Sequence, residues 1–246
     1  MPEPSPTSPI GPGAVWLLCA WLGGAAFVGS LALFLYDYTT RFGMLQSDEI
    51  VIPGLLNTAI FTIFALHHSL FARTGAKQLV VRFVPVWFER SLYTWTASLL
   101  FLGVVLAWQP VDGVIYAADR YWRWIGYAAQ GIGILLTIRG SSALDVLDLA
   151  GIRPVLDARR SAMPRHVPLE TTGVYGFVRH PLYFGWALFV FGAPTMTGTR
   201  AVFAVVSTVY LAIAIPFEER ALIRLFGDGY RTYQQRTRWR MIPGLY

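Results

Sequence analysis

The stretch Arg179-His180-Pro181 has residue types and an order suited to holding an anion. Proline lacks an amide hydrogen and has a fixed φ, so Pro181 predicts the first residue of a helix, with His180 at its cap. Free amides at that end carry the positive end of the helix dipole, which favours a carboxylate or a phosphate. The alternative is an ordinary membrane helix with an interfacial arginine. The amides expected to be free belong to Leu182, Tyr183 and Phe184.

Two adjacent carboxylates, Glu218 and Glu219, follow the last apolar run of the chain. Carboxylates at a membrane boundary are costly to desolvate unless they are paired or hydrated. Pairing with Arg220 or Arg224 is one explanation. The other is that a carboxylate holds a pair of ribose hydroxyls or faces a sulfonium cation. The residues alone leave both explanations open.

The composition indicates that lipid is the main solvent of this chain. Of its 246 residues 55% are hydrophobic and only 14% are charged, with a mean hydropathy of +0.49, too few polar residues to cover a soluble globule. The net charge of +6 does not indicate a nucleic-acid partner, because the basic residues lie between apolar runs rather than on one face. A single cysteine, Cys19, gives no disulfide framework and no metal-ligand spacing. We expect no metal site.

The apolar runs predict an all-α polytopic membrane protein with five to six transmembrane helices, since about 20 apolar residues cross a bilayer. Tryptophans near run ends, among them Trp108, Trp122 and Trp124, are typical of an interfacial belt. Only residues 197–200 separate the last two runs, so we expect a helical hairpin whose far ends meet. The predicted runs are Ala14–Tyr36, Val51–Ala72, Ser91–Trp108, Trp122–Ile138, Pro181–Met196 and Ala201–Phe217.

The positive charges predict the orientation in the membrane. With six spans, segments 73–90, 139–181 and 218–246 share one side and hold 16 of the 20 Lys and Arg residues. Because such residues accumulate on the cytoplasmic side, we expect both termini and a cofactor-binding tail to face the cytosol from the inner membrane. Three regions follow: a disordered tail at 1–13, transmembrane helices at 14–138 and a catalytic region at 139–246. No feature predicts an oligomeric state.

The pattern of the closing region resembles the isoprenylcysteine carboxyl methyltransferase superfamily. It runs from Gly173-Val174-Tyr175 through Arg179-His180-Pro181 and Tyr183 to Glu218-Glu219 and Tyr230. The resemblance implies a membrane enzyme that binds S-adenosylmethionine (SAM) between the two ends of the closing hairpin. The residues that it implies at the cofactor are Tyr175, Arg179, His180, Pro181, Leu182, Tyr183, Glu218 and Glu219.

A narrower similarity, to bacterial methanethiol S-methyltransferases, covers about residues 64–240. It rests on Leu66–Arg73, Arg82–Pro85, Asp148–Arg153 and Ala193–Thr197. It implies methylation of a small thiol, methanethiol to dimethyl sulfide, with His67, His68 and Arg153 near the acceptor. The carboxyl methyltransferases have an arginine where this chain has Ala214, which speaks against a prenylcysteine carboxylate as acceptor.

A thiol acceptor requires a group that takes its proton. Imidazoles titrate near neutrality, and an apolar pocket raises a carboxylate toward that range, so His180 and Glu219 are the expected catalytic residues, ahead of His67 and His68. Alternatives are another lipophilic acceptor such as a phospholipid amine or an isoprenoid, and a non-catalytic accessory protein of the NnrU type. A sterol-reductase-like NADPH site fits less well, because paired carboxylates suit a sulfonium better than a phosphate.

Overall fold

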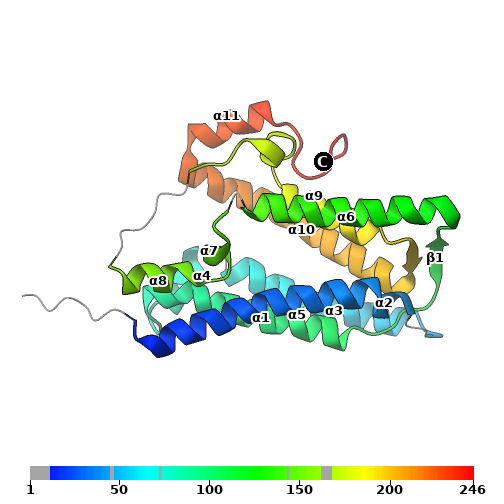
Figure 1. Cartoon of the computed structure of the whole chain (residues 1–246), viewed down its shortest axis with the longest axis horizontal. Helices are drawn as coiled ribbons and strands as arrows, with labels where there is room; N and C mark the ends of the chain where they lie inside the picture. Colours follow the sequence, from blue (N-terminus) through cyan, green and yellow to red (C-terminus); the bar gives the residue numbers. More distant parts are fainter. Residues whose placement is uncertain (1–11, 45–46, 72–73, 143, 162–167) are drawn as a thin grey trace, which may run out of the picture.

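The protein is built almost entirely of helices (Figure 1), and the predicted all-α polytopic membrane fold is confirmed. The computed structural model describes residues 12–44, 47–71, 74–142, 144–161 and 168–246. Most of the predicted tail at 1–13 therefore lies outside the described residues, as do residues 162–167 of the predicted catalytic region. The long helices are α1 (Ala14–Thr39), α3 (Val51–Phe71), α5 (Glu89–Ala107), α6 (Arg120–Ser142), α9 (Pro181–Phe191) and α10 (Gly198–Phe226).

Short helices connect the long ones and gather at the ends of the molecule. The lower layer of Figure 1 contains α1, α3 and α5, the upper layer contains α6, α9 and α10, and the C-terminal segment lies on top. The arginine-rich connections gather toward one end of the view, opposite α2 and the strands. The short helices are α2 (Arg41–Met44), α4 (Thr74–Val80), α7 (Val146–Leu149), α8 (Arg153–Arg159), α11 (Asp228–Arg236) and the 3-10 helices η1 (Val86–Phe88) and η2 (Gly173–Gly176).

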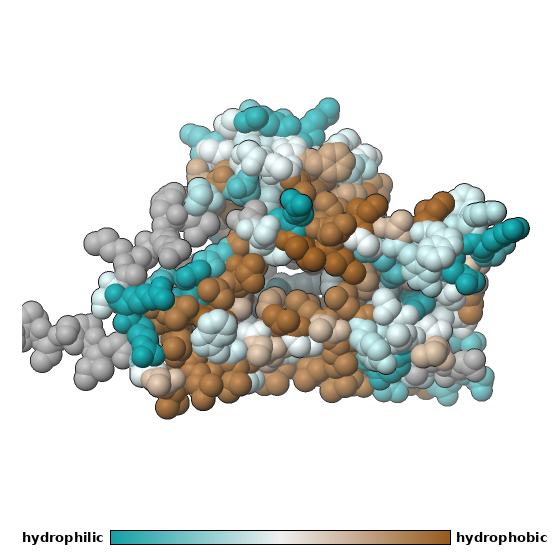
Figure 2. Space-filling view, in the orientation of Figure 1, coloured by the Kyte–Doolittle hydropathy of each residue, from teal (hydrophilic) through white to brown (hydrophobic). Residues whose placement is uncertain are grey.

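Four helical stretches of the described chain are long and apolar enough to cross a membrane. They are Ala14–Met44, Val51–Phe71, Val86–Ala107 and Gly198–Phe226. Helix α9 is apolar but has only 11 residues, and the 23-residue α6 is not among the four. Figure 2 shows a hydrophobic belt across the middle of this face and hydrophilic side chains at both ends and on top, as a bilayer requires.

The predicted fifth run, Pro181–Met196, is too long. Helix α9 ends at Phe191, because Gly192 and Pro194 follow and neither favours helix continuation. The chain then becomes extended as β2 (Thr195–Thr197), which pairs antiparallel with β1 (Val114–Ala117). No feature of the sequence predicted these strands.

The β ladder anchors the start of α10. The hydroxyl of Thr197 donates to the carbonyl of Phe42 at 2.8 Å, and it caps α10 by accepting from the amide of Arg200 at 3.3 Å. A Cβ at Gly198 would lie 2.1 Å from the carbonyl oxygen of Asp112, so only glycine allows this approach. The hairpin of α9 and α10 is therefore fixed at the end away from α11.

Aromatic side chains from α1, α9 and α10 form the centre of the bundle. Phe34 stacks on Trp186 and on Phe203, with centroid separations of 4.9 and 4.7 Å. Trp108 is part of this core at 2% exposure and donates to the carbonyl of Thr199, so its predicted place in an interfacial belt is wrong. Trp122 and Trp124 are exposed, because they lie on the outer surface of α6.

Helices α6 and α9 pack with their backbones almost in contact. A Cβ at Gly133 would lie 2.5 Å from the carbonyl oxygen of Gly185, and one at Gly185 would lie 2.6 Å from that of Gly133. Small residues of this kind allow close packing of membrane helices. This contact holds α9 and the cap residue His180 against α6.

We expect Gly133→Ala to lower the free energy of unfolding by about 1–3 kcal/mol, because overpacking must push α9 away from α6. Gly131, on the same helix with no atom near its would-be Cβ, provides the control. Gly131→Ala should be neutral, or stabilising by up to about 1 kcal/mol through helix propensity. Titrating detergent-solubilised protein with SDS measures both; equal effects would contradict the packing argument.

Candidate active site

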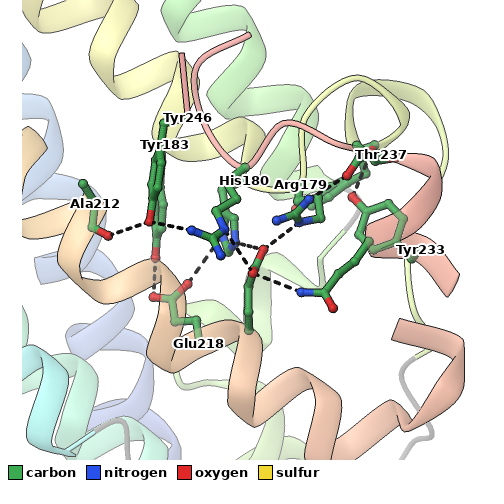
Figure 3. A network of polar contacts seen from close by, with 12 residues as sticks. Arg179, His180, Tyr183, Ala212, Glu218, Tyr233, Thr237 and Tyr246 are labelled. Atoms are coloured by element: carbon green, nitrogen blue, oxygen red, sulfur yellow. Dashed lines mark hydrogen bonds and ion pairs between the residues drawn. The ribbon is translucent and has the colours of Figure 1, made fainter. Parts of the chain in front are cut away.

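A buried ion pair joins the start of α9 to the end of α10 (Figure 3). The Nε of Arg179 donates to Oε1 of Glu219 at 2.6 Å, and the two side chains are only 6% and 5% exposed. The Nη1 of Arg179 also donates to the carbonyls of Thr237 and Arg238, at 2.7 and 2.9 Å. One guanidinium therefore binds the start of α9, the end of α10 and the C-terminal segment together.

The second oxygen of Glu219 is occupied as well. Its Oε2 accepts from Nε2 of Gln234 at 3.1 Å and lies 3.4 Å from Nε of Arg240. Local pairing with Arg220 or Arg224, one of the two explanations that the sequence left open, is therefore not the arrangement found, and the carboxylate instead binds arginines distant in sequence. The sequence did not single out Gln234 or Arg240, and the run of arginines toward the C-terminus was a signal for Arg240 only.

Glu218 has a different environment from its neighbour. Its side chain is 43% exposed, and its Oε1 accepts from the hydroxyl of Tyr183 at 2.5 Å. No guanidinium of the described residues pairs with it. Of the two carboxylates, Glu218 is the one that a ligand can reach.

His180 lies between the two carboxylates. Its Nδ1 is 3.6 Å from Oε2 of Glu218, and its Nε2 is 3.5 Å from Oε1 of Glu219. The ring is buried and stacks on Tyr183, with centroids 5.4 Å apart and planes at 9°. Within the part of the chain that the structure describes, Nε2 is buried and has no hydrogen-bond partner. Each ring nitrogen therefore faces one carboxylate, Nδ1 facing Glu218 and Nε2 facing Glu219.

Pro181 is the first residue of α9 and His180 is its cap, as predicted. Three amides were predicted to be free, and for two of them the prediction is wrong. The amides of Tyr183 and Phe184 both donate to the carbonyl of His180 at 3.1 Å. The helix closes its first turn by 3-10 and α-type bonds, so its N-terminus offers fewer donors to an anion than expected.

The C-terminal segment covers this site with backbone and side-chain contacts. The amides of Arg179 and His180 donate to the carbonyls of Trp239 and Arg240, at 2.9 and 2.8 Å. In addition, the hydroxyl of Tyr246 donates to the carbonyl of Ala212 at 3.2 Å. The last ten residues are thus part of the candidate site; the sequence predicted a cofactor-binding tail but singled out none of these residues.

Tyr175 and Leu182 lie beside the ion pair and face α6 and α11. The Tyr175 hydroxyl donates to the carbonyl of Gly140 at 3.1 Å, and its own carbonyl accepts from the hydroxyl of Tyr233 at 2.7 Å. Burial, with the nearby charge of Glu170, raises the pKa of Tyr175 to about 12, so it remains a donor at neutral pH. A cavity of about 390 Å³ adjoins Tyr233, and its walls mix polar and apolar surface. It is lined by Thr171, Gly176, Gly229, Thr232, Tyr233, Arg236 and Thr237.

The three residues predicted near an acceptor do not form one cluster. Arg153 makes a two-point pair with Asp145 at 2.6 and 3.2 Å, and this hydrogen bond lowers the pKa of Asp145. No contact between Arg153 and either histidine is present among the described residues. His67 and His68 adjoin each other in α3 but have different partners.

His68 belongs to a polar group that reaches from α3 and α5 toward α10. Its Nδ1 lies 2.8 Å from the hydroxyl of Tyr93, and the neighbouring Ser69 hydroxyl lies 3.3 Å from that of Tyr210. Sequence reasoning missed Tyr93 and Tyr210, because nothing local distinguishes a tyrosine inside the bundle from one at the interface.

Comparison with known proteins relates this chain to membrane methyltransferases. Residues 121–229 match the phospholipid methyltransferase family. The chain is 29% identical to methanethiol S-methyltransferase 2 of Bradyrhizobium diazoefficiens over 94% of its own length and 90% of that protein. It is 32% identical to the methanethiol S-methyltransferases of Pseudomonas deceptionensis and Crocosphaera subtropica, over 74% and 77% of its length and 70% and 75% of theirs. No solved structure matches.

The buried pair makes a stability prediction. Glu219→Ala leaves Arg179 charged and buried without its carboxylate, so we expect a loss of about 3–5 kcal/mol in the free energy of unfolding. Asp228→Ala is the matched control, because Asp228 pairs with Arg231 on the exposed surface of α11 and should contribute little. The free energy of unfolding of both variants can be measured in mixed micelles. A loss no larger than that of the control would contradict the role given to Glu219.

Proposed function

Because the chain belongs to the family of membrane methyltransferases that includes the methanethiol S-methyltransferases, we propose that it methylates a small thiol with SAM as donor. Methanethiol is the proposed acceptor and dimethyl sulfide the product. The observation that carries the donor half is the pair of unlike carboxylates at the hairpin ends. One is neutralised and buried, and the other is half-exposed beside His180 and Tyr183.

The residues at this site fit the chemistry of the donor. When bound, SAM supplies an electrophilic methyl group on a sulfonium, together with ribose hydroxyls and an amino-acid group. Glu218 is exposed, and no arginine among the described residues pairs with it. Its carboxylate is therefore suited to bind a cation or a pair of hydroxyl groups. The unpartnered Nε2 of His180 offers a further polar contact. Tyr175, Arg179, Pro181, Leu182 and Tyr183 complete the proposed donor site around these two.

The proposed catalytic residues divide into two roles. Glu219 already accepts from Arg179 and Gln234 and lies against Arg240, which favours a positioning role. His180 is better suited to take up the thiol proton at Nε2, because the resulting imidazolium would lie within 3.6 Å of both carboxylates. His67 and His68 remain candidates on the acceptor side.

A site between membrane helices favours this reaction. A thiolate and a sulfonium have opposite charges that disappear as the methyl group moves, so water stabilises the separated reactants more than the transition state. Excluding water therefore lowers the barrier, and holding the reacting atoms in line adds an entropic advantage.

We further propose a location in the inner membrane with both termini in the cytosol. The described parts of the arginine-rich segments 73–90, 139–181 and 218–246 lie toward the end of the molecule that holds the proposed donor site, which supports this orientation. The donor would then enter from the cytosol at the region 139–246, and the acceptor would come through the helices at 14–138.

Purified protein incubated with SAM and methanethiol should release dimethyl sulfide, measured by gas chromatography of the headspace. A panel with a phospholipid amine and an isoprenoid quinol tests the alternative acceptors. If SAM binds but no dimethyl sulfide forms, the acceptor assignment is wrong and the donor assignment stands. If SAM does not bind at all, the accessory-protein alternative is favoured instead.

Glu218→Ala should weaken SAM binding by an order of magnitude or more, because a charge-assisted contact contributes about 1.5–3 kcal/mol. Calorimetric titration of the purified variant measures the dissociation constant. The control is Asp228→Ala, an exposed carboxylate on the neighbouring helix that should leave the affinity unchanged. Both variants should keep their helix content by circular dichroism. An unchanged affinity in Glu218→Ala would rule out this position for the donor.

A further inference from the structure

A second cavity, of about 440 Å³, lies between α3, α4 and α5 and is almost entirely apolar. Its walls include Leu99, which is 54% exposed, and Phe71, which is 37% exposed. Since this part of the chain is a membrane-spanning region, these residues border on lipid. The full lining is His67, Phe71, Val80, Glu89, Leu92, Tyr93, Thr96, Leu99 and Leu100.

One polar atom at this cavity has no partner. The Nδ1 of His67 is buried and makes no hydrogen bond with the described residues. The His67 ring instead stacks on Phe71, with centroids 4.7 Å apart, and lies parallel to Tyr93 at 6.1 Å. A buried, unpaired nitrogen in an apolar cavity is costly. A ligand that is mainly apolar and carries one weak donor would relieve that cost.

Tyr93 connects this cavity to the donor site. Its ring lines the cavity, while its hydroxyl lies 2.8 Å from Nδ1 of His68 on the inner side of α3. Ser69, the neighbour of His68, lies 3.3 Å from the hydroxyl of Tyr210 in α10, the helix that also carries Glu218. The cavity wall is thus joined through α3 to the helix of the exposed carboxylate.

We propose that the cavity between α3, α4 and α5 is a binding pocket for the methyl acceptor, one that takes a small uncharged thiol from the bilayer. This assignment rests on the proposed thiol methylation. Apolar walls bind the alkyl group, and the His67 ring, whose Nδ1 has no partner among the described residues, offers an acceptor to the S–H group. From this pocket the thiol passes Tyr93 to the donor site, where His180 takes its proton. Apart from Glu89, the described lining has no charged group, so an anionic or large polar acceptor finds no matching partner there.

The first test measures binding without turnover. Thr96→Cys in a Cys19→Ser background places a thiol on the cavity wall, and N-ethylmaleimide labels it at a rate followed by mass spectrometry. Dimethyl sulfide is the probe, because it matches the acceptor in size and does not react with maleimide. When dimethyl sulfide saturates the pocket, we expect the rate at which N-ethylmaleimide labels Thr96→Cys to fall about fivefold. Thr58→Cys is the matched control, since Thr58 is also a threonine bonded to its own helix but lies outside the cavity.

The second test uses turnover. Thr96→Trp fills the cavity, so we expect KM for methanethiol to rise on the order of tenfold while the dissociation constant of SAM is unchanged. Thr58→Trp, which adds the same ring to a lipid-facing site, should leave KM unaltered.

The two tests separate this proposal from the proposed function. Suppose that the protein produces dimethyl sulfide, but the probe does not slow labelling of Thr96→Cys and the KM of Thr96→Trp is normal. The pocket assignment would then be wrong, while thiol methylation would stand. Protection of Thr96→Cys in a protein that methylates no thiol would instead support a pocket for small apolar molecules and refute the proposed function.

Discussion

The buried contact between Arg179 and Glu219 is the constraint on which the site depends. Neither charge is stable alone in a low-dielectric interior, so each must find complete pairing. Arg179 achieves it by donating to Glu219 and to two carbonyls of the C-terminal segment. The position of α9 against α10, and of the tail over both, follows from satisfying that one guanidinium.

This pairing makes two adjacent carboxylates different. Consecutive residues of a helix point about 100° apart, so Glu219 turns into the junction while Glu218 faces the opening. Glu219 is buried, and its carboxylate contacts Arg179, Gln234 and Arg240. Glu218 keeps only Tyr183 and the edge of His180, which leaves it able to bind a cationic or hydroxylic ligand.

A polar site and an apolar cavity lie toward the same end of the bundle. The proposed donor site lies where the C-terminal segment meets α9 and α10, and the apolar cavity beside His67 borders on lipid. Polar contacts inside the bundle lie near both: Tyr93 with His68, and Ser69 with Tyr210. In the proposed function a charged donor would therefore approach from water and an apolar acceptor from lipid.

The sequence by itself determined the membrane fold, the start of α9 at Pro181 and the family, because hydropathy, a fixed proline φ and local motif spacing are properties of short segments. It did not predict β2, which depends on pairing with the distant β1. Nor did it identify the partners of Glu219: it offered nearby Arg220 or Arg224 as one explanation, whereas the fold supplies Arg179 and Arg240. The cavity beside His67 likewise exists only once α3, α4 and α5 pack. Such contacts join residues far apart in the chain, and their energies arise only when tertiary packing removes water from between them.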